Sequence, residues 1–414
     1  MTSLFSWFVG IDWSSKSHQV CLMGADGSVR ADRSFPHGGA GQAALARWLL
    51  DTTGAAPGQI AVAIETPRGP VVEGLLAAGF AVHSIGPSQI RGPRYRYSPS
   101  GAKDDRRDAR MLARALRADP QLFRRLALEP PLVLQVRERT RTVNELTRQL
   151  TRYQNQIGQQ LWRYFPQLLQ IPGLRGQLVE PWFVALWEKA RTPQQAAQLT
   201  LRALRNLLKK HGIRRLSAPA LRDILQTPAL SVAPGTAEAA TRALTSLFAQ
   251  ARTTHQLLLQ AQRDIRGLLQ AFPHTEANDD RPEDLTILLS LPGVGLFVAG
   301  TLFAEAYDLL QRRDYRALRL RSGVAPVRIE SGETGWDARR LNVQHELREA
   351  VYHWARVASM RDPVSKARYQ ALRGRGHSHG RALRTIGDRL LAMACAMLRD
   401  GTLYDPNHTR RAAA

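Results

Sequence analysis

The order of apolar segments in the first 120 residues restricts this chain to few folds. Runs that alternate or are continuously apolar are typical of strands, and runs with apolar residues every three or four positions are typical of helices. The predicted strands are residues 5–11, 17–23, 28–35, 60–64 and 80–85. The predicted helices are residues 41–50, 71–78 and a segment that begins near residue 105. Three strands in a meander, followed by alternating helices and strands, predict an α/β domain.

This order of elements is the layout of a ribonuclease-H-like fold. In such a sheet the first and fourth strands are neighbours, and here they end at Asp12 and Glu65. A late helix can then lie across the ends of both strands. Alone, Asp12 could equally cap a turn, and Glu65 could be an ordinary surface residue.

The late helix carries acids and bases at its start. Asp105 and Asp108 are three positions apart, which places both carboxylates on one face of a helix. Lys103, Arg106 and Arg107 surround them. Acids on one face amid bases that bind phosphate indicate a metal site that acts on a nucleic-acid backbone. The alternative is a solvated helix start, where acidic residues are favourable without any ligand.

Together, Asp12, Glu65, Asp105 and Asp108 are expected to meet at one point of the sheet. Four carboxylates that close could not all ionise without a compensating positive charge. A site with oxygen ligands only suits magnesium, or manganese as a second choice.

Charge indicates a polyanionic partner. The formal net charge is +23, and 52 of the 58 basic residues are arginine. Arginine makes planar, bidentate phosphate contacts, although codon usage could also explain the bias. Residues 1–85 carry five basic and six acidic side chains, whereas residues 312–414 carry 21 and ten. A near-neutral beginning followed by basic segments, including the loop of 86–101 with Arg91, Arg94 and Arg96, fits nucleic-acid binding.

The remaining features of composition predict a cytoplasmic protein. The only two cysteines, Cys21 and Cys395, provide neither a disulfide framework nor a cysteine zinc site. No signal peptide or membrane-spanning run is recognisable.

Beyond the first domain, which we place at residues 1–130, the chain is mostly helical. Residues 131–284 contain two long helical runs, 132–165 and 237–272, that are expected to pair as a coiled-coil or hairpin arm around a smaller helical insert. Such an arm serves either dimerisation or clamping of nucleic acid, and the sequence does not separate the two. Residues 285–414 form the third predicted domain.

Two short motifs stand out in this third domain. Leu291-Pro292-Gly293-Val294-Gly295 fits either a helix–hairpin–helix, whose amides bind phosphate, or a plain turn between helices. Ser331 lies in Glu330-Ser331-Gly332-Glu333, which on its own fits a turn.

These motifs resemble, in order and almost from end to end, the DEDD-type insertion-sequence transposases. The N-terminal resemblance is carried by Gly10-Ile11-Asp12-Trp13-Ser14, by Glu65-Thr66, and by Lys103-x-Asp105-x-x-Asp108-Ala109-x-x-Leu112-Ala113. The C-terminal resemblance is carried by Leu291-Pro292-Gly293-Val294-Gly295, Gly323-Val324-Ala325-Pro326, Ser331-Gly332, Leu347-Arg348 and the tail from Tyr369 to Leu383. The middle helices match only in character.

The resemblance implies a recombinase that excises and inserts a mobile DNA element. It implies a RuvC-like N-terminal domain in which Asp12, Glu65, Asp105 and Asp108 bind magnesium. It also implies a serine nucleophile, which falls on Ser331, and a structured guide RNA encoded by the element. DNA, this RNA and further copies of the chain, as a dimer or tetramer, are the expected partners. The expected nucleic-acid contacts are Arg91, Arg94, Arg96, Lys103, Arg106, Arg107, Arg339, Arg340 and Arg348.

Three positions depart from the family pattern. Asp104 replaces the usual threonine, Glu330 precedes Ser331 where a neutral amide is common, and Leu341-Asn342 replaces Gly-Asn. Ser322 is a competing serine in a Ser-Gly pair, but it precedes Val-Ala-Pro, where the family has an ordinary small residue.

Two other functions are compatible with the residues. A metal-dependent nuclease of the RuvC or Holliday-junction-resolvase type would use the four acids and leave Ser331 structural. A nucleic-acid-binding scaffold would use the acids only as caps and ion pairs.

Overall fold

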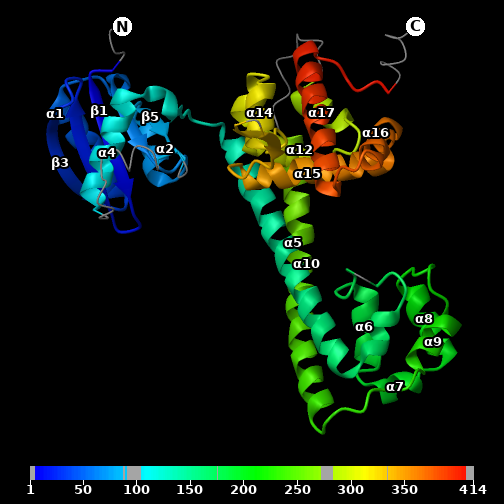
Figure 1. Cartoon of the computed structure of the whole chain (residues 1–414). Coiled ribbons are helices and arrows are strands. Elements are labelled where there is room, and N and C mark those ends of the chain that lie inside the picture. The colour runs from blue at the N-terminus through cyan, green and yellow to red at the C-terminus, as the bar shows by residue number, and fades with distance from the viewer. Residues whose placement is uncertain are drawn as a thin grey trace, which may run out of the picture. The chain divides into compact units, whose positions relative to one another are not determined.

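The protein is described by a computed structural model that covers residues 5–86, 89–90, 104–174, 176–271, 283–332 and 334–406. It divides into two compact units, Met1–Pro130 and Pro131–Ala414. The first is a mixed α/β unit and the second is mostly helical, as the sequence predicts (Figure 1). The boundary between residues 284 and 285 stays a prediction, since the arm and the C-terminal part lie in the same unit.

The first unit is built on a six-stranded sheet with the order β3-β2-β1-β4-β5-β6. The first three strands form an antiparallel meander, β4 and β5 run parallel to β1, and β6 is antiparallel to β5. The strands are β1 (Trp7–Trp13), β2 (Ser17–Gly24), β3 (Val29–Pro36), β4 (Ile60–Ile64), β5 (Ala81–Ser84) and β6 (Arg124–Arg125). Only β6 was not predicted, because two exposed arginines carry no apolar pattern.

Helices cover both faces of this sheet. They are α1 (Gly39–Thr53), α2 (Pro70–Ala77) and α4 (Asp105–Ala118). Since side chains alternate along a strand, Val9 and Ile11 of β1 join the core under α1 and α2, and Phe8 joins the core under α4. Both cores are continuous and apolar, so the strand ends are held in fixed positions.

The second unit is organised by two long helices, α5 (Pro131–Tyr164) and α10 (Thr236–Gln270), which lie side by side (Figure 1). Val136 of α5 packs with Ile265 of α10, while Leu161 of α5 shares a core with Leu244 of α10. The early part of one helix thus meets the late part of the other, so the pair is antiparallel.

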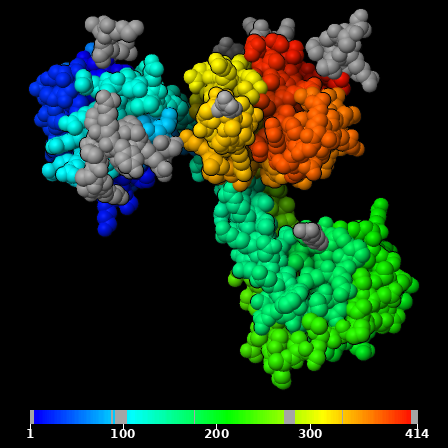
Figure 2. Space-filling view, in the orientation of Figure 1, coloured from blue at the N-terminus to red at the C-terminus, as the bar shows by residue number. Residues whose placement is uncertain are grey.

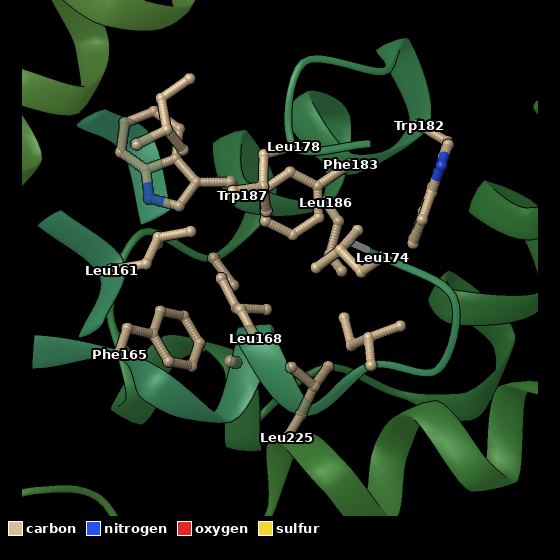
Figure 3. Close-up of a cluster of buried hydrophobic side chains, with 14 of the residues drawn as sticks. Leu161, Phe165, Leu168, Leu174, Leu178, Trp182, Phe183, Leu186, Trp187 and Leu225 are labelled. Atoms are coloured by element: carbon tan, nitrogen blue, oxygen red, sulfur yellow. The ribbon is translucent and has the colours of Figure 1, made fainter. Parts of the chain in front are cut away.

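A helical insert connects the two long helices. Its elements are α6 (Pro181–Lys189), α7 (Pro193–Ala197), α8 (Leu201–Lys210) and α9 (Ala218–Leu225). Its aromatic and leucine side chains, including Phe183 and Trp187, fill one core together with Leu161 of α5 (Figure 3). Figure 2 shows the insert, in green, as a rounded mass without open channels on this face. Helix α6 was not predicted, because Pro181 reads as a break; in the structure this proline occupies the first turn, where no amide donor is required.

The C-terminal part of the second unit packs on the other end of the helix pair. Its elements are α11 (Asp284–Ser290), α12 (Leu296–Glu305), α13 (Tyr307–Gln311), α14 (Tyr315–Arg321), β7 (Val327–Ser331), β8 (Thr334–Ala338), α15 (His345–Arg361), α16 (Pro363–Gly374) and α17 (His379–Asp400). Strands β7 and β8 form an antiparallel hairpin that the sequence patterns did not predict. No helix in the described ranges is long and apolar enough to cross a bilayer.

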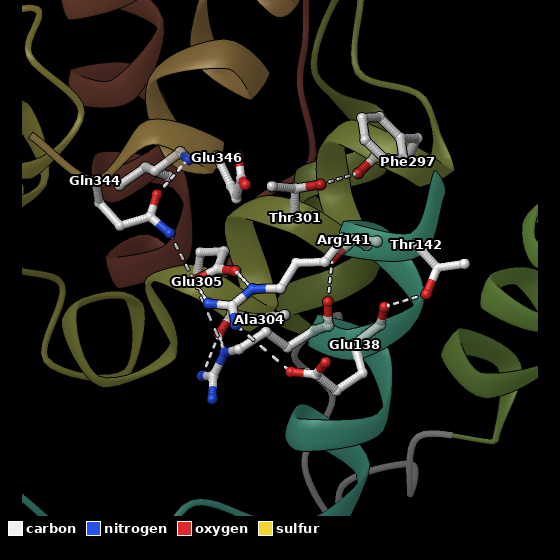
Figure 4. A network of polar contacts seen from close by, with 12 residues as sticks. Glu138, Arg141, Thr142, Phe297, Thr301, Ala304, Glu305, Gln344 and Glu346 are labelled. Atoms are coloured by element: carbon white, nitrogen blue, oxygen red, sulfur yellow. Dashed lines mark hydrogen bonds and ion pairs between the residues drawn. The ribbon is translucent and has the colours of Figure 1, made fainter. Parts of the chain in front are cut away.

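A buried ionic network joins this part to the arm (Figure 4). Arg137 of α5 is 1% exposed and donates to the carbonyl oxygen of Ala304, and Arg141 binds the carboxylate of Glu305 with an Nε–Oε1 distance of 2.8 Å. The amide of Gln344 donates to the same carboxylate at 2.7 Å. One buried acid therefore connects α5, α12 and the cap of α15.

Candidate metal site and nucleic-acid interface

The first half of the site depends on a close approach between β1 and α4. Gly10 faces α4, and a Cβ atom added there would lie 1.9 Å from the carbonyl oxygen of Ala109. Any larger residue would push the helix off the sheet. Glycine at position 10 therefore lets the α4 backbone lie directly on β1.

The direction of α4 follows from contacts at its two ends. Near its C-terminus, Arg117 donates from Nη1 to the carbonyl oxygen of Ala25 at 3.1 Å, beside the start of β1. At its N-terminus, Asp105 lines an open surface depression together with Gln19, the cross-strand partner of Asp12. Helix α4 thus runs antiparallel to β1 and brings its acidic first turn to the end of β1 that carries Asp12.

Asp12 and Glu65 occupy matching places on neighbouring strands. Ile11 of β1 is paired with Ile64 of the parallel strand β4, and each acid is the next residue along its strand. Asp12 is two positions from Gly10 and so shares the face that α4 covers. Both acids are half-buried. The ends of β1 and β4 therefore lie next to each other, as predicted.

The two helical aspartates differ in exposure. Asp108 is 7% exposed and lies one turn before the buried Leu112, whereas Asp105 is exposed. All four predicted acids therefore lie at one end of the sheet, on one face of it.

Among the described residues, no group of three or more histidine, cysteine or acidic side chains is close enough to hold a metal ion. The four acids share a location without forming a closed ligand cage. Asp12, Glu65 and Asp108 each have other polar or electrostatic interactions. In donor chemistry and placement the set fits a divalent cation that prefers oxygen ligands, once the carboxylates turn toward one another.

Asp104, the departure from the family pattern, has a structural role. Its side chain accepts a hydrogen bond from the Arg106 amide at 3.0 Å and caps α4. A threonine hydroxyl could do the same, since both side chains are good N-caps. The extra acid is thus explained by the helix start.

The arginines around α4 divide into two groups. Arg110 points back to the sheet and binds Asp32, with an Nε–Oδ2 distance of 2.9 Å. Burial raises the pKa of the Asp32 carboxyl, but the hydrogen bond and charge of Arg110 outweigh this effect, so the pKa lies below its usual value.

The Cys21 thiol lies beside this ion pair. Burial is the main cause that raises its pKa to about 12, and the neighbouring Asp32 carboxylate is the second, so this thiol stays neutral.

Arg106 and Arg107 are exposed, and Nε of Arg107 lies 3.6 Å from the Asp104 carboxylate, so a phosphate would compete with this surface ion pair. The other predicted contacts near this site, Arg91, Arg94, Arg96 and Lys103, lie outside the described residues.

Ser331 ends β7 at the tip of the exposed hairpin. Its partner Thr334 donates to its carbonyl oxygen at 2.9 Å, and Gly332 adopts the left-handed backbone conformation with φ +58°. The Ser331 side chain is exposed, and no described residue is hydrogen-bonded to its hydroxyl. Glu330 is paired with Arg328 at 3.0 Å, which balances the added charge beside the serine.

The competing Ser322 has the opposite environment. It is 1% exposed, and its hydroxyl donates to the carbonyl oxygen of Arg319 at 3.4 Å. This serine is accounted for by the end of α14.

The turn between α11 and α12 is packed inside the unit. A Cβ atom on Gly293 would lie 2.8 Å from the Ala358 amide nitrogen, and the indole of Trp354 donates to the carbonyl oxygen of Pro292 at 2.9 Å. This packing accounts for the glycine without a bound phosphate, and so favours a plain turn.

Arg339 and Arg340 lie between the hairpin and α15, and Arg348 lies in the first turn of α15. Sequence reasoning missed two arginines that gather with them, Arg381 and Arg384 of α17. The pKa of the Arg384 guanidinium is lowered, mainly by burial and to a smaller degree by the positive charges of Arg339 and Arg381. Arg381 and Arg384 are three positions apart on one predicted helix and follow a Gly-rich loop. This spacing was the sequence signal that could have identified them as basic residues on one face.

Two parts of the chain match families of transposases. Residues 9–166 match a family model of DEDD transposases of the IS110 type, and residues 285–370 match a model described as "Transposase IS116/IS110/IS902 family".

Two relatives illustrate the extent of the similarity. The chain is 30% identical over 389 residues to the "Mini-circle putative transposase for IS117" of Streptomyces coelicolor, covering 93% of this chain and 92% of that protein. It is 43% identical over 220 residues to "Putative transposase y4uE" of Sinorhizobium fredii; this match covers 53% of the chain but only 60% of that relative.

Proposed function

The chain belongs to the IS116/IS110/IS902 family of transposases, and from this premise we propose that it excises and inserts a mobile DNA element by phosphoryl transfer. The proposed catalytic residues are Asp12, Glu65, Asp105, Asp108 and Ser331. One observation carries the proposal: the close contact at Gly10 brings the acidic start of α4 to the ends of β1 and β4, where Asp12 and Glu65 lie.

The N-terminal unit would act as a RuvC-like domain. Asp12 and Glu65 from the strand ends, with Asp105 and Asp108 from α4, would hold magnesium or manganese. The bound metal would neutralise charge on the scissile phosphate and lower the pKa of an attacking hydroxyl. Half-burial of two carboxylates and full burial of Asp108 keep them ordered before the ligand arrives. The exposed Arg106 and Arg107 would bind neighbouring backbone phosphates.

Ser331 would be the nucleophile. Its hydroxyl oxygen would form a bond to phosphorus while the bond from phosphorus to one deoxyribose oxygen breaks, and the departing oxygen would take up a proton. One phosphodiester would thus be exchanged for a phosphoserine ester, so strand joining would need no external nucleotide. Exposure of Ser331 supports this role, because an attacking hydroxyl must reach a DNA strand.

The family resemblance extends the proposal to partners. Strand choice would be directed by a structured RNA from the element, and two duplexes would be recombined by a dimer or tetramer in the bacterial cytoplasm. The net charge of +23 supports contact with nucleic acid.

Substitution tests both halves of the site. We expect Asp12→Asn and Ser331→Ala each to abolish strand exchange on a supercoiled donor substrate, and only Asp12→Asn to weaken magnesium binding in calorimetry. Asp51→Asn, at an exposed position of α1, and Ser231→Ala, at an exposed position before α10, are the matched controls.

A covalent protein–DNA adduct, mapped to Ser331 by mass spectrometry, would identify the nucleophile. Cleavage that persists in Ser331→Ala without any adduct would favour a metal-dependent nuclease of the resolvase type instead. Absence of magnesium binding to the unmodified protein would leave a nucleic-acid-binding scaffold.

A further inference from the structure

A small cavity lies between α15, α17 and the end of the β7–β8 hairpin. It is lined by the Ser322-Gly323 turn, Arg339, Arg348, Tyr352, Gly380 and Arg384, and its volume is about 180 Å³. Helices α15 and α17 pack against each other (Figure 1), and both contribute to its lining. Ligand pockets for whole small molecules measure about 300–1,000 Å³, so this cavity suits a single compact group.

The charges that line the cavity are mostly positive. Arg339 follows the last residue of β8, Arg348 lies on α15 and Arg384 lies on α17. Within the described ranges, neither Arg339 nor Arg384 has a hydrogen-bonded or ionic partner for its side chain. The one hydrogen bond of the Arg348 side chain to a described residue joins its Nη2 to Nδ1 of His345 at 2.9 Å. The cavity therefore gathers cations that the protein itself does not neutralise.

The single acid in the lining is already engaged. Glu349 accepts from Arg148 of α5 at 2.9 Å, which draws its charge toward the arm. Because Arg148 satisfies this carboxylate, Glu349 is a poor partner for the cavity arginines. The unbalanced cations are also costly, since burial and the charges of Arg339 and Arg381 lower the pKa of Arg384.

The start of α17 adds to the positive field. This helix of 22 residues begins at His379, and the Ser378 hydroxyl accepts a hydrogen bond from the Arg381 amide. Among the residues that the structure describes, the Gly380 amide at the cavity wall has no hydrogen-bond acceptor, and the helix dipole favours an anion there. Three arginines from separate parts of the chain and a helix start together make a site for one tetrahedral anion.

We propose that this cavity binds one phosphodiester phosphate of a nucleic-acid strand and thereby anchors the strand that reaches the β7–β8 hairpin. The anchoring role rests on the proposed function, whereas phosphate binding does not. Strand β8 joins the two places: Arg339 follows its last residue, and Thr334 at its other end pairs with Ser331. At ~3.4 Å per residue over the five residues from Thr334 to Arg339, the anchored phosphate would lie about 17 Å along the hairpin from the serine.

The salt dependence of binding tests the cavity directly. For a full-length protein binding a DNA duplex, the slope of log K against log salt falls by about 0.9 for each phosphate that the protein no longer neutralises. We expect Arg384→Gln and Arg339→Gln each to reduce the slope by about this amount. The double variant should show no further reduction, because both arginines would bind the same phosphate. Arg389→Gln, an arginine on α17 outside the cavity, is the matched control and should leave the slope unchanged.

The same series on an RNA duplex shows whether DNA or RNA supplies the phosphate. A slope change on either duplex supports the cavity, and equal slopes for Arg384→Gln and Arg389→Gln on both would overturn it. Slope changes that add in the double variant would overturn the assignment to one phosphate. Circular dichroism of each variant excludes unfolding as the cause.

Failure of this inference can be told apart from failure of the proposed function. If the wild-type protein forms the Ser331 adduct but shows no slope change in Arg384→Gln, only the cavity assignment is wrong. If the slope changes but no adduct forms, the cavity binds phosphate and the serine mechanism is wrong.

Discussion

The acidic region of the first unit and the serine hairpin of the second are built in opposite ways. Asp12, Glu65 and Asp108 lie at the edge of a continuous core, and the spacing of β1 and α4 leaves no room for a Cβ at position 10. Ser331 lies on a two-stranded hairpin whose residues are nearly all exposed. The proposed metal ligands are thus placed by packing, whereas the proposed nucleophile is placed by a local turn. Disturbing the first should affect stability and activity together, and disturbing the second should affect activity alone.

The strongest test of this contrast is Gly10→Ala. The added methyl group would overlap the Ala109 carbonyl, so we expect the free energy of unfolding to fall by about 3 kcal/mol, at the upper end of overpacking effects. Denaturant titration measures the loss. Gly39→Ala is the control, since nothing lies within 4 Å of the added Cβ. A stable Gly10→Ala protein with normal strand exchange would show that α4 is not held as tightly as described.

A smaller effect is expected from Asp104. Asp104→Ala removes the cap of α4 and should lower the free energy of unfolding by about 1 kcal/mol, while Asp104→Thr should retain most of the stability. Magnesium affinity should be unchanged in both variants. A large loss of magnesium binding in Asp104→Thr would show that this acid is a metal ligand, and Asp104 would then join the four proposed acids.

In the hairpin, Gly332→Ala places a side chain in the left-handed backbone region, which disfavours the turn by about 1 kcal/mol. Because the hairpin packs on little else, global unfolding should change by less than about 0.5 kcal/mol while strand exchange slows. Gly332→Asn, which tolerates this conformation better, should restore part of the rate. Equal losses of global stability in Gly332→Ala and Asp104→Ala would contradict the contrast between the two regions.

The smallest effect concerns pH. The pKa of Asp32 is lowered in the folded state, so its ion pair with Arg110 stabilises the fold above the unfolded-state pKa of 3.8 and loses this contribution as pH falls through the folded-state pKa. Asp32→Asn should therefore be less stable than wild type near neutral pH, and the difference should shrink in acid. Urea titrations between about pH 7 and pH 3 measure it, with the exposed Asp51→Asn as control. A difference that grows toward low pH would reverse the assigned sign.

The sequence predicted those features that depend on regular patterns. The strand order placed Asp12 beside Glu65, and the spacing of Asp105 and Asp108 placed them on one end of α4. The β7–β8 hairpin was missed because its strands are exposed and carry no apolar alternation. The convergence of Arg384 with Arg339 depends on how α17 packs against α15, which no local pattern records.

The insert between α5 and α10 has a consequence for variation among relatives. Its core is filled by its own short helices and by one end of the helix pair, where Leu161 and Leu244 already meet. Shortening or enlarging residues 165–235 would therefore alter the arm's tip while Glu305, Arg137 and Arg141 keep the opposite end in register. A relative with a longer or shorter insert is therefore expected to keep the contacts at the opposite end of the helix pair.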